Sequence, residues 1–297
     1  MKRKEAGQAK KRAKARNAAK KESTGAVRFF YGTRVGRVLL RGVMRTHADR
    51  LAVFYLRSRA SKPFIRWYAK RNGVALTRRH GYRSFREFFI RTRDGLGVDT
   101  RPEHLISPCD GYLSACRIYE DSSFTVKGKR YRLGDLLQDE TLAKSFHGGD
   151  CLIIRLTPSD YHHYCYIDDG VQGENHFIEG ELHSVQSAAC ERYPVYTLNR
   201  RCWTLLETER FGPVVQTEVG ALVVGGIVND RENAPFRRGE EMGHFELAGS
   251  TVVLMFQRDR IALEEPIARQ LAEGGEYRVR MGMCLGSARL SSAPLCH

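Results

Sequence analysis

Hydrophobic and polar positions follow two different patterns along the chain, and the change comes near residue 100. Within residues 28–90, apolar side chains recur at three- and four-residue spacing over 35–44 and 50–58, and the short segment 84–92 closes this region. This period predicts amphipathic helices. After residue 100, short apolar runs bounded by Gly, Asp or Pro predict strands over 111–118, 150–156, 163–167, 214–218, 221–227, 250–256 and 276–281.

One helix is predicted among these strands, around residues 133–143. Together the patterns predict an α+β fold, in which an N-terminal helical region (residues 25–95) lies on a β-rich body (residues 96–290). Residues 1–24 carry 10 basic residues and no large apolar side chain beyond Met1, so we expect a disordered tail there.

Charge is distributed unevenly over these regions. Residues 1–80 hold 24 of the 49 basic residues but only 3 of the 34 acidic residues, within a net charge of +15. Such an arm suits a polyanion, either a nucleic acid or an anionic membrane surface. Because Arg alternates with aromatic and aliphatic residues over 28–70, this region has the composition of a membrane-docking interfacial helix. A helical subdomain with solvated arginines is the alternative.

Several classes of protein are excluded by the sequence. The longest apolar or glycine stretch, residues 219–228, has ten residues, fewer than the roughly 18 of a membrane-spanning helix. The basic N-terminus is followed by no apolar core, so a secretory signal is not expected and the default location is inside the cell. The eight cysteines form no CxxC pair, and no other ligand spacing predicts a metal site.

A Gly-Ser-Thr triplet at residues 249–251 heads one apolar run and is weak as an isolated motif. Its surroundings carry more information: the blocks FFYGTRVGRVLL, YRSFREFFIRT, ISPCDGYLSACRI, IIRLTPSDYHHYCYIDDG, TEVGALVVGGIV, RRGEEMGHFELAGSTVVLMF and EYRVRMGMCLG follow one another between residues 29 and 286. In this order and spacing, these blocks resemble the phosphatidylserine decarboxylases, which are pyruvoyl enzymes made as self-cleaving proenzymes.

The resemblance implies a carboxy-lyase that makes its own cofactor. Ser250 would attack the carbonyl of Gly249, and the chain would separate into a β chain (1–249) and an α chain (250–297) whose first residue becomes a pyruvoyl group. That ketone would form a Schiff base with the amine of phosphatidylserine and withdraw electrons from the bond to the carboxylate. The products would be carbon dioxide and phosphatidylethanolamine, as part of phospholipid biosynthesis.

The family activates the serine with an Asp-His-Ser arrangement. Asp110 and Ser250 match it, but the histidines depart from the common pattern Asp-Tyr-His-Arg-x-His. His162 matches the first histidine, while Cys165 occupies the place of the second. The base for self-cleavage is therefore His162, His183 or Cys165, in that order of preference. His163 stands where the family usually has Arg, and we expect a surface or packing role.

These expectations lead to a peripheral enzyme on the cytoplasmic face of the cell membrane, drawn to its anionic substrate by the basic region. The α and β chains of one precursor would be its partners, with no metal and no nucleic acid. The alternative from another class is an inactive decarboxylase-like module whose basic arm binds nucleic acid or anionic membranes. Within enzymes, the alternative substrates are a related serine-headed lipid or a smaller amino acid.

Overall fold

The structure, a computed structural model, describes residues 25–45, 48–76, 81–93, 95, 97–126, 128–221, 226–247 and 250–289, with the side chains of 43–50 and 187 left aside. The predicted tail (1–24) and Gly249 lie outside the described residues. Helices and many antiparallel strands are both present, so the predicted α+β class is confirmed.

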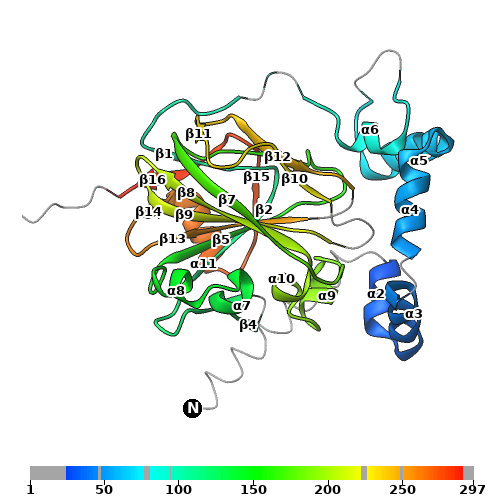
Figure 1. Ribbon diagram of the computed structural model, residues 1–297, viewed down its shortest axis with the longest axis horizontal. Coiled ribbons are helices and arrows are strands. Elements are labelled where there is room, and N and C mark those ends of the chain that lie inside the picture. The colour runs from blue at the N-terminus through cyan, green and yellow to red at the C-terminus, as the bar shows by residue number, and fades with distance from the viewer. Residues whose placement is uncertain are drawn as a thin grey trace, which may run out of the picture.

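The first part of the chain is helical, as predicted, and lies along one side of the β-rich body (Figure 1, right). Its segments are short and end at identifiable residues. Ser84 accepts a hydrogen bond from the backbone N–H of Glu87 and caps the last helix, and Gly73 ends the preceding one in a left-handed conformation (φ 66°). In order the elements are α2 (Gly25–Gly32), α3 (Arg34–Arg45), α4 (Ala48–Arg57), the 3₁₀ turn η1 (Arg59–Ser61), α5 (Lys62–Asn72) and α6 (Phe85–Phe89).

The body consists of strands with a few short helices. Its strands are β1 (His104–Ile106), β2 (Gly111–Arg117), β3 (Ser123–Val126), β4 (Lys129–Arg132), β5 (Asp150–Arg155), β6 (His163–Cys165), β7 (Gly170–Ile178), β8 (Arg201–Thr208), β9 (Gly212–Val219), β10 (Ile227–Asn229), β11 (Pro235–Phe236), β12 (Glu241–Phe245), β13 (Thr251–Phe256), β14 (Ile261–Leu263), β15 (Tyr277–Val279) and β16 (Cys284–Ala288). Its helices are α7 (Leu133–Leu137), α8 (Glu140–Lys144), α9 (Ser187–Cys190), α10 (Val195–Leu198) and α11 (Glu265–Ala272).

An eight-stranded sheet in the order β11-β7-β8-β9-β13-β5-β2-β15 forms the centre of the body. Its two faces carry separate cores because side chains alternate along each strand. In β13, for example, Val252 and Leu254 pack with the small sheets β10-β12-β6 and β1-β16-β14, whereas Val253 and Met255 pack with α7, α9, α10 and α2. The central strand β13 is therefore buried along its whole length.

One row of paired residues crosses this sheet and defines the edge that matters for function. The row runs through Ile178, Arg201, Val219, Thr251, Arg155, Tyr112 and Arg278. Asp110 directly precedes β2 and Ser250 directly precedes β13, so both lie at this edge. The segment that carries His162 begins there as well, because it follows the end of β5.

Two expected elements differ from the structure. The helix predicted around residues 133–143 is two helices, α7 and α8, because Gln138 takes a left-handed conformation (φ 55°) and Asp139 caps the second helix through the backbone N–H groups of Thr141 and Leu142. The strand predicted over 221–227 is not observed as such. β10 begins only at Ile227, and residues 222–225 lie outside the described part.

The helical region is fastened to the site edge by ion pairs and aromatic packing. Glu246, which is nearly buried, accepts hydrogen bonds from Arg57 of α4 (2.5 Å) and Arg86 of α6 (2.5 and 2.9 Å). Phe88 and Phe89 pack with Leu247 in a third core cluster. The region between helix α4 and the edge of the sheet therefore moves as one packed unit.

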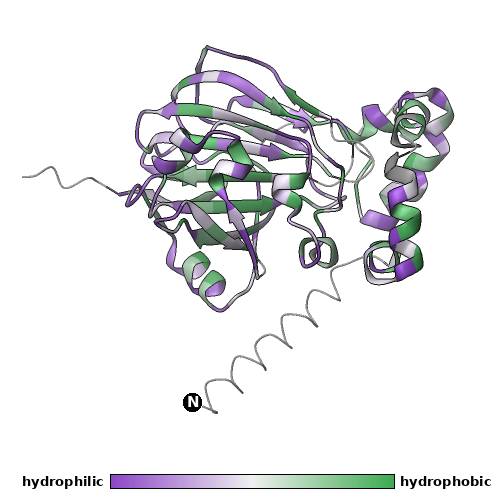
Figure 2. Ribbon diagram, turned by 60° about the horizontal axis from the view of Figure 1, so that its bottom comes forward, coloured by the Kyte–Doolittle hydropathy of each residue, from purple (hydrophilic) through white to green (hydrophobic). Residues whose placement is uncertain are grey.

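The outer surface of the helical region combines apolar and basic side chains, seen as mixed green and purple along these helices in Figure 2. Phe54 is 76% exposed and Leu51 is 75% exposed, and further exposed apolar residues are Phe29, Val35, Val38, Leu39, Tyr55, Trp67 and Leu76. None of the described helices has both the length and the apolarity that crossing a bilayer requires.

Candidate active site

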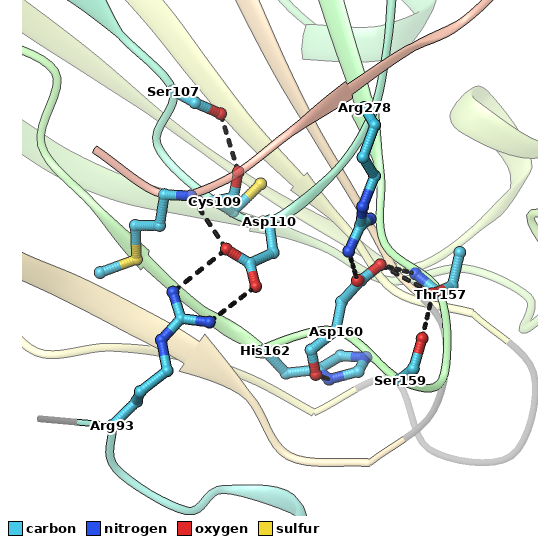
Figure 3. A network of polar contacts seen from close by, with 10 residues as sticks. Arg93, Ser107, Cys109, Asp110, Thr157, Ser159, Asp160, His162 and Arg278 are labelled. Atoms are coloured by element: carbon cyan, nitrogen blue, oxygen red, sulfur yellow. Dashed lines mark hydrogen bonds and ion pairs between the residues drawn. The ribbon is translucent and has the colours of Figure 1, made fainter. Parts of the chain in front are cut away.

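Asp110 lies in the turn that leads into β2 and is held from two directions. The guanidinium of Arg93 donates to both carboxylate oxygens, at 3.0 Å and 3.4 Å, and the backbone N–H of Met281 donates to Oδ1 at 2.9 Å (Figure 3). The turn needs Gly111, because a Cβ there would come within 2.8 Å of the carbonyl oxygen of Arg155. The result is a fixed, nearly buried carboxylate at the sheet edge.

His162 follows a tight turn at the end of β5. The carboxylate of Asp160 accepts hydrogen bonds from the backbone N–H and the hydroxyl of Thr157, at 2.6 Å and 2.8 Å, and pairs with Arg278 (Figure 3). Nδ1–H of His162 donates to the backbone carbonyl of Asp160 at 2.9 Å. Because a carbonyl can only accept, this bond fixes the proton on Nδ1 and leaves the lone pair on Nε2.

The environment of His162 favours its basic form. Its ring is fully buried and lies 4.1 Å from the ring of Phe89, and Nε2 has no hydrogen-bond partner among the described residues. Burial, reinforced by the charge of Arg91, lowers the pKa of His162 to about 4 in spite of the opposing carboxylate of Asp160. His162 is therefore a neutral imidazole near pH 7, with a free lone pair inside the protein.

Ser250 is buried at the start of β13. Its hydroxyl has no hydrogen-bond partner among the described residues, although its backbone carbonyl accepts from the N–H of Leu156 at 2.9 Å. The strand order places β5 between Ser250 and Asp110, which corresponds to two strand spacings, or about 10 Å. A buried hydroxyl without a partner costs stability, so its retention at this edge points to a chemical role.

The structure thus brings Asp110, His162 and Ser250 to one edge without joining them directly. Within the described ranges no hydrogen bond links any two of the three. The backbone carbonyl of His162 instead accepts from the N–H of Phe245, five residues before Ser250. The edge therefore assembles a fixed carboxylate, a neutral imidazole and an unpartnered hydroxyl, which is the set of groups that nucleophilic catalysis by a serine needs.

His183 lies at the same edge but on the other side of β13. The hydroxyl of Tyr31 donates to its Nδ1 at 3.3 Å, and its Nε2–H donates to Glu181 at 2.6 Å. The ring stacks on Tyr193, and Asn199 connects the backbone of His183 to the carbonyl of Gly220. Because both ring nitrogens are engaged, His183 has no free lone pair in this arrangement.

Cys165 and His163 are also buried. Burial raises the pKa of the Cys165 thiol to about 12, and the thiol faces the carbonyl oxygen of Ser107 at 3.9 Å. A thiol in this state cannot take a proton from a serine near neutral pH. His163 packs between Tyr161 and His244 and pairs with Glu241, which agrees with a packing role and not with a surface position.

Three contributors to the site were missed by sequence reasoning. Arg93 holds Asp110, Arg278 holds the turn before His162, and Phe89 covers the ring of His162. Arg278 and Phe89 lie within the matched blocks but were not singled out, and Arg93 carries no motif signal. Each reaches the edge from a segment distant in sequence, so only the folded chain reveals the contact.

Comparison with known proteins gives this geometry a family. Residues 85–287 match the model of the phosphatidylserine decarboxylase family. Phosphatidylserine decarboxylase proenzyme 2 of Clostridium acetobutylicum is 36% identical over 274 residues, covering 90% of this chain and 93% of the relative. The proenzyme of Ruminiclostridium cellulolyticum is 34% identical over 263 residues (86% and 87%), and that of Desulfitobacterium hafniense is 32% identical over 273 residues (88% and 91%). The chain therefore belongs to the phosphatidylserine decarboxylase family.

Proposed function

We propose that this chain is a self-cleaving carboxy-lyase that converts phosphatidylserine to phosphatidylethanolamine and carbon dioxide. The observation that carries the proposal is the pair of buried, unpartnered groups at one sheet edge, the hydroxyl of Ser250 and Nε2 of His162. The relatives are named as phosphatidylserine decarboxylase proenzymes, which supports both the substrate and the processed form.

Self-cleavage would begin at Ser250. Its Oγ bonds to the carbonyl carbon of Gly249 and the peptide C–N bond breaks, which gives an ester. Loss of the α-proton of residue 250 then breaks the bond between its Cβ and the ester oxygen. Water converts the resulting dehydroalanine to a pyruvoyl group and releases ammonia. The products are the β chain 1–249 and the α chain 250–297, and the three-carbon cap fits the buried position of Ser250, where no hydrogen bond has to be replaced.

The chain's own residues then have distinct tasks. His162 is the preferred base for the Ser250 proton, because its neutral Nε2 is free, whereas His183 has both nitrogens engaged and Cys165 is a protonated thiol. Asp110, locked by Arg93, supplies a fixed negative charge at the edge. The pyruvoyl group supplies an electron sink for the bond to the substrate carboxylate. His162 afterwards returns a proton to the product carbon.

Intact mass measurement under denaturing conditions tests this proposal. The purified protein is expected to give a 48-residue fragment with a blocked N-terminus, and to release carbon dioxide from phosphatidylserine in mixed micelles. One uncut chain of 297 residues without turnover would favour the inactive-module alternative.

We expect the substitution of His183 by glutamine to leave self-cleavage within about tenfold of the wild-type rate, because loss of a general base costs 10²- to 10⁴-fold. The ring of His183 is engaged by Tyr31 and Glu181 and packs with the helical region, so its loss affects mainly stability. The measurement is the half-time of fragment appearance after synthesis in a cell-free system. A 100-fold slower cleavage in a stably folded variant would instead make His183 the base.

Membrane attachment forms a second part of the proposal, with the enzyme held peripherally at the cytoplasmic face. The helical region presents exposed apolar side chains such as Leu51 and Phe54 among basic residues, and the substrate is itself anionic. Nucleic acid is the competing polyanion, and the same surface apolarity argues against it, since a phosphate backbone offers apolar side chains nothing to pack on.

Deletion of residues 1–21 is expected to weaken binding to phosphatidylserine-containing vesicles by at least about tenfold at low salt, because each basic residue near an anionic surface contributes about 1 kcal/mol. Cleavage is expected to continue, which mass measurement checks. Vesicle sedimentation gives the binding, with neutral vesicles and single-stranded RNA as controls. Unchanged vesicle binding would make the tail irrelevant to membranes, and preferential RNA binding would contradict the membrane proposal.

A further inference from the structure

Beside the candidate active site lies a second cluster of potential ligand groups, formed by His163 of β6 and by Glu241 and His244 of β12. The two strands are antiparallel partners, and His244 lies directly opposite His163. Glu241 and His244 are three residues apart, and in a regular strand they would point to opposite faces. The register shift between Glu241 and Gly243 adds one residue to β12, so both side chains reach the same face.

The three side chains are close enough to share one ion. One ligand atom from each lies within 4.8 Å of the others, and Nδ1 of His163 lies 2.6 Å from Oε1 of Glu241. Ligands of a tetrahedral zinc ion at 2.0–2.1 Å are about 3.3 Å apart. The cluster therefore needs only a small side-chain adjustment to close around a metal.

Hydrogen-bond accounting at His163 asks for a cation at this position. Nε2–H of His163 donates to the backbone carbonyl of Ile90 at 3.1 Å, which fixes the proton on Nε2 in the neutral ring. Its Nδ1 lone pair then faces a carboxylate oxygen of Glu241, and two acceptors at 2.6 Å repel each other. Either a second proton on His163 or a metal ion removes this conflict, and a backbone carbonyl on the remote nitrogen is the usual outer contact of a metal-binding histidine.

His244 distinguishes these two solutions. Its Nε2 is buried and has no hydrogen-bond partner among the described residues, and a proton on His163 would leave that nitrogen unsatisfied. Burial, with the neighbouring His163, lowers the pKa of His244, so its ring is neutral near pH 7 and its lone pairs are available. A metal ion satisfies all three groups together, which a proton does not.

We propose that His163, Glu241 and His244 bind one divalent transition-metal ion of the zinc class. Two imidazoles and one carboxylate match the ligand preference of zinc and not that of Ca²⁺ or Mg²⁺, which prefer oxygen. Glu241 is partly exposed, so the ion can enter from solvent on that side and retain water as its fourth ligand. The ion is a positioning element: it ties β6 to β12 directly after His162, whose carbonyl already pairs with Phe245.

Metal binding is tested on the untagged full chain, stripped with a chelator and titrated with Zn²⁺ against a chromophoric competitor. Co²⁺ provides a second probe through the visible absorption of its four-coordinate form. All three ligands precede residue 249, so the test is independent of cleavage and of decarboxylase activity. We expect one Zn²⁺ per chain, a raised Tm, and a loss of affinity beyond about 100-fold in His244→Gln, since loss of an outer contact alone costs 10- to 100-fold.

Matched variants keep the proposal falsifiable. Glu241→Gln preserves shape and is expected to lose most of the affinity as well, whereas His176→Gln removes an exposed imidazole and is expected to bind Zn²⁺ like the wild type. Cys284→Ser tests the other cluster of ligand groups, Asp99, His104 and Cys284. Binding that survives both cluster variants, or that disappears in Cys284→Ser, overturns the proposal. So does a stripped wild-type chain that binds no Zn²⁺.

Discussion

Replacement of Ser250 by alanine is expected to leave one uncut chain of 297 residues with no decarboxylase activity above background. The hydroxyl of Ser250 is the proposed nucleophile and also the source of the carbonyl carbon of the cofactor, so its loss removes both steps together. The variant is expected to fold, because the hydroxyl makes no hydrogen bond among the described residues. Denaturing mass measurement and product formation from phosphatidylserine give the two readouts.

Thr217→Val is a matched control for this experiment. Thr217 lies on the neighbouring strand β9, is fully buried and likewise has a hydroxyl without a partner. Its replacement removes an orphaned hydroxyl from the same sheet without touching the proposed chemistry, so cleavage is expected to continue. A cleaved Ser250→Ala protein would eliminate Ser250 as the nucleophile.

Replacement of His162 by alanine is expected to lower the rate of decarboxylation by about 10²- to 10⁴-fold, the usual contribution of a positioned acid or base. Cleavage is expected to slow as well if His162 also acts on Ser250. Turnover per pyruvoyl group, with the fraction of cleaved chain measured in parallel, separates the two effects. Wild-type turnover by the cleaved variant would reject the assigned role.

The pH dependence gives a second readout for His162. Burial chiefly lowers its pKa to about 4, so the basic form persists in the folded protein well below pH 6.5. The unfolded chain binds this proton first, near pH 6.5, so stability due to the neutral ring is complete above pH 6.5 and is lost as pH falls toward 4. Between pH 6.5 and 5 the loss is up to about 2 kcal/mol. Urea unfolding of wild type and His162→Gln is expected to show this difference, and parallel curves would contradict it.

The apolar runs predicted the centre of the fold and missed its flank. β5 and β13 are buried on both faces and therefore appear as continuous hydrophobic segments in the sequence. β7 was missed because its residues, GVQGENHFI, alternate between partly buried and exposed positions at the side of the sheet, and polar side chains suit that environment. Pairing with β8 supplies the information that local composition lacks.

The candidate site divides in the same way. Asp110, His162 and Ser250 were predicted because each stands in a recognisable block, and the register of the sheet then brings the three blocks to one edge. The preference for His183 as an alternative base could not be evaluated from the sequence, because its partners Tyr31 and Glu181 come from different regions. The metal cluster could not be predicted either. It depends on a one-residue bulge that spacing alone does not reveal.

The position of β13 determines how the mature protein can be assembled. The proposed α chain contributes β13 between β9 and β5, β15 at the edge of the same sheet, and β14 and β16 around β1. Neither polypeptide retains a complete sheet without the other. The uncut chain folds in a unimolecular reaction at any dilution, whereas two severed chains must first meet. Refolding of the processed enzyme is therefore bimolecular, and its yield rises with concentration, while that of Ser250→Ala does not.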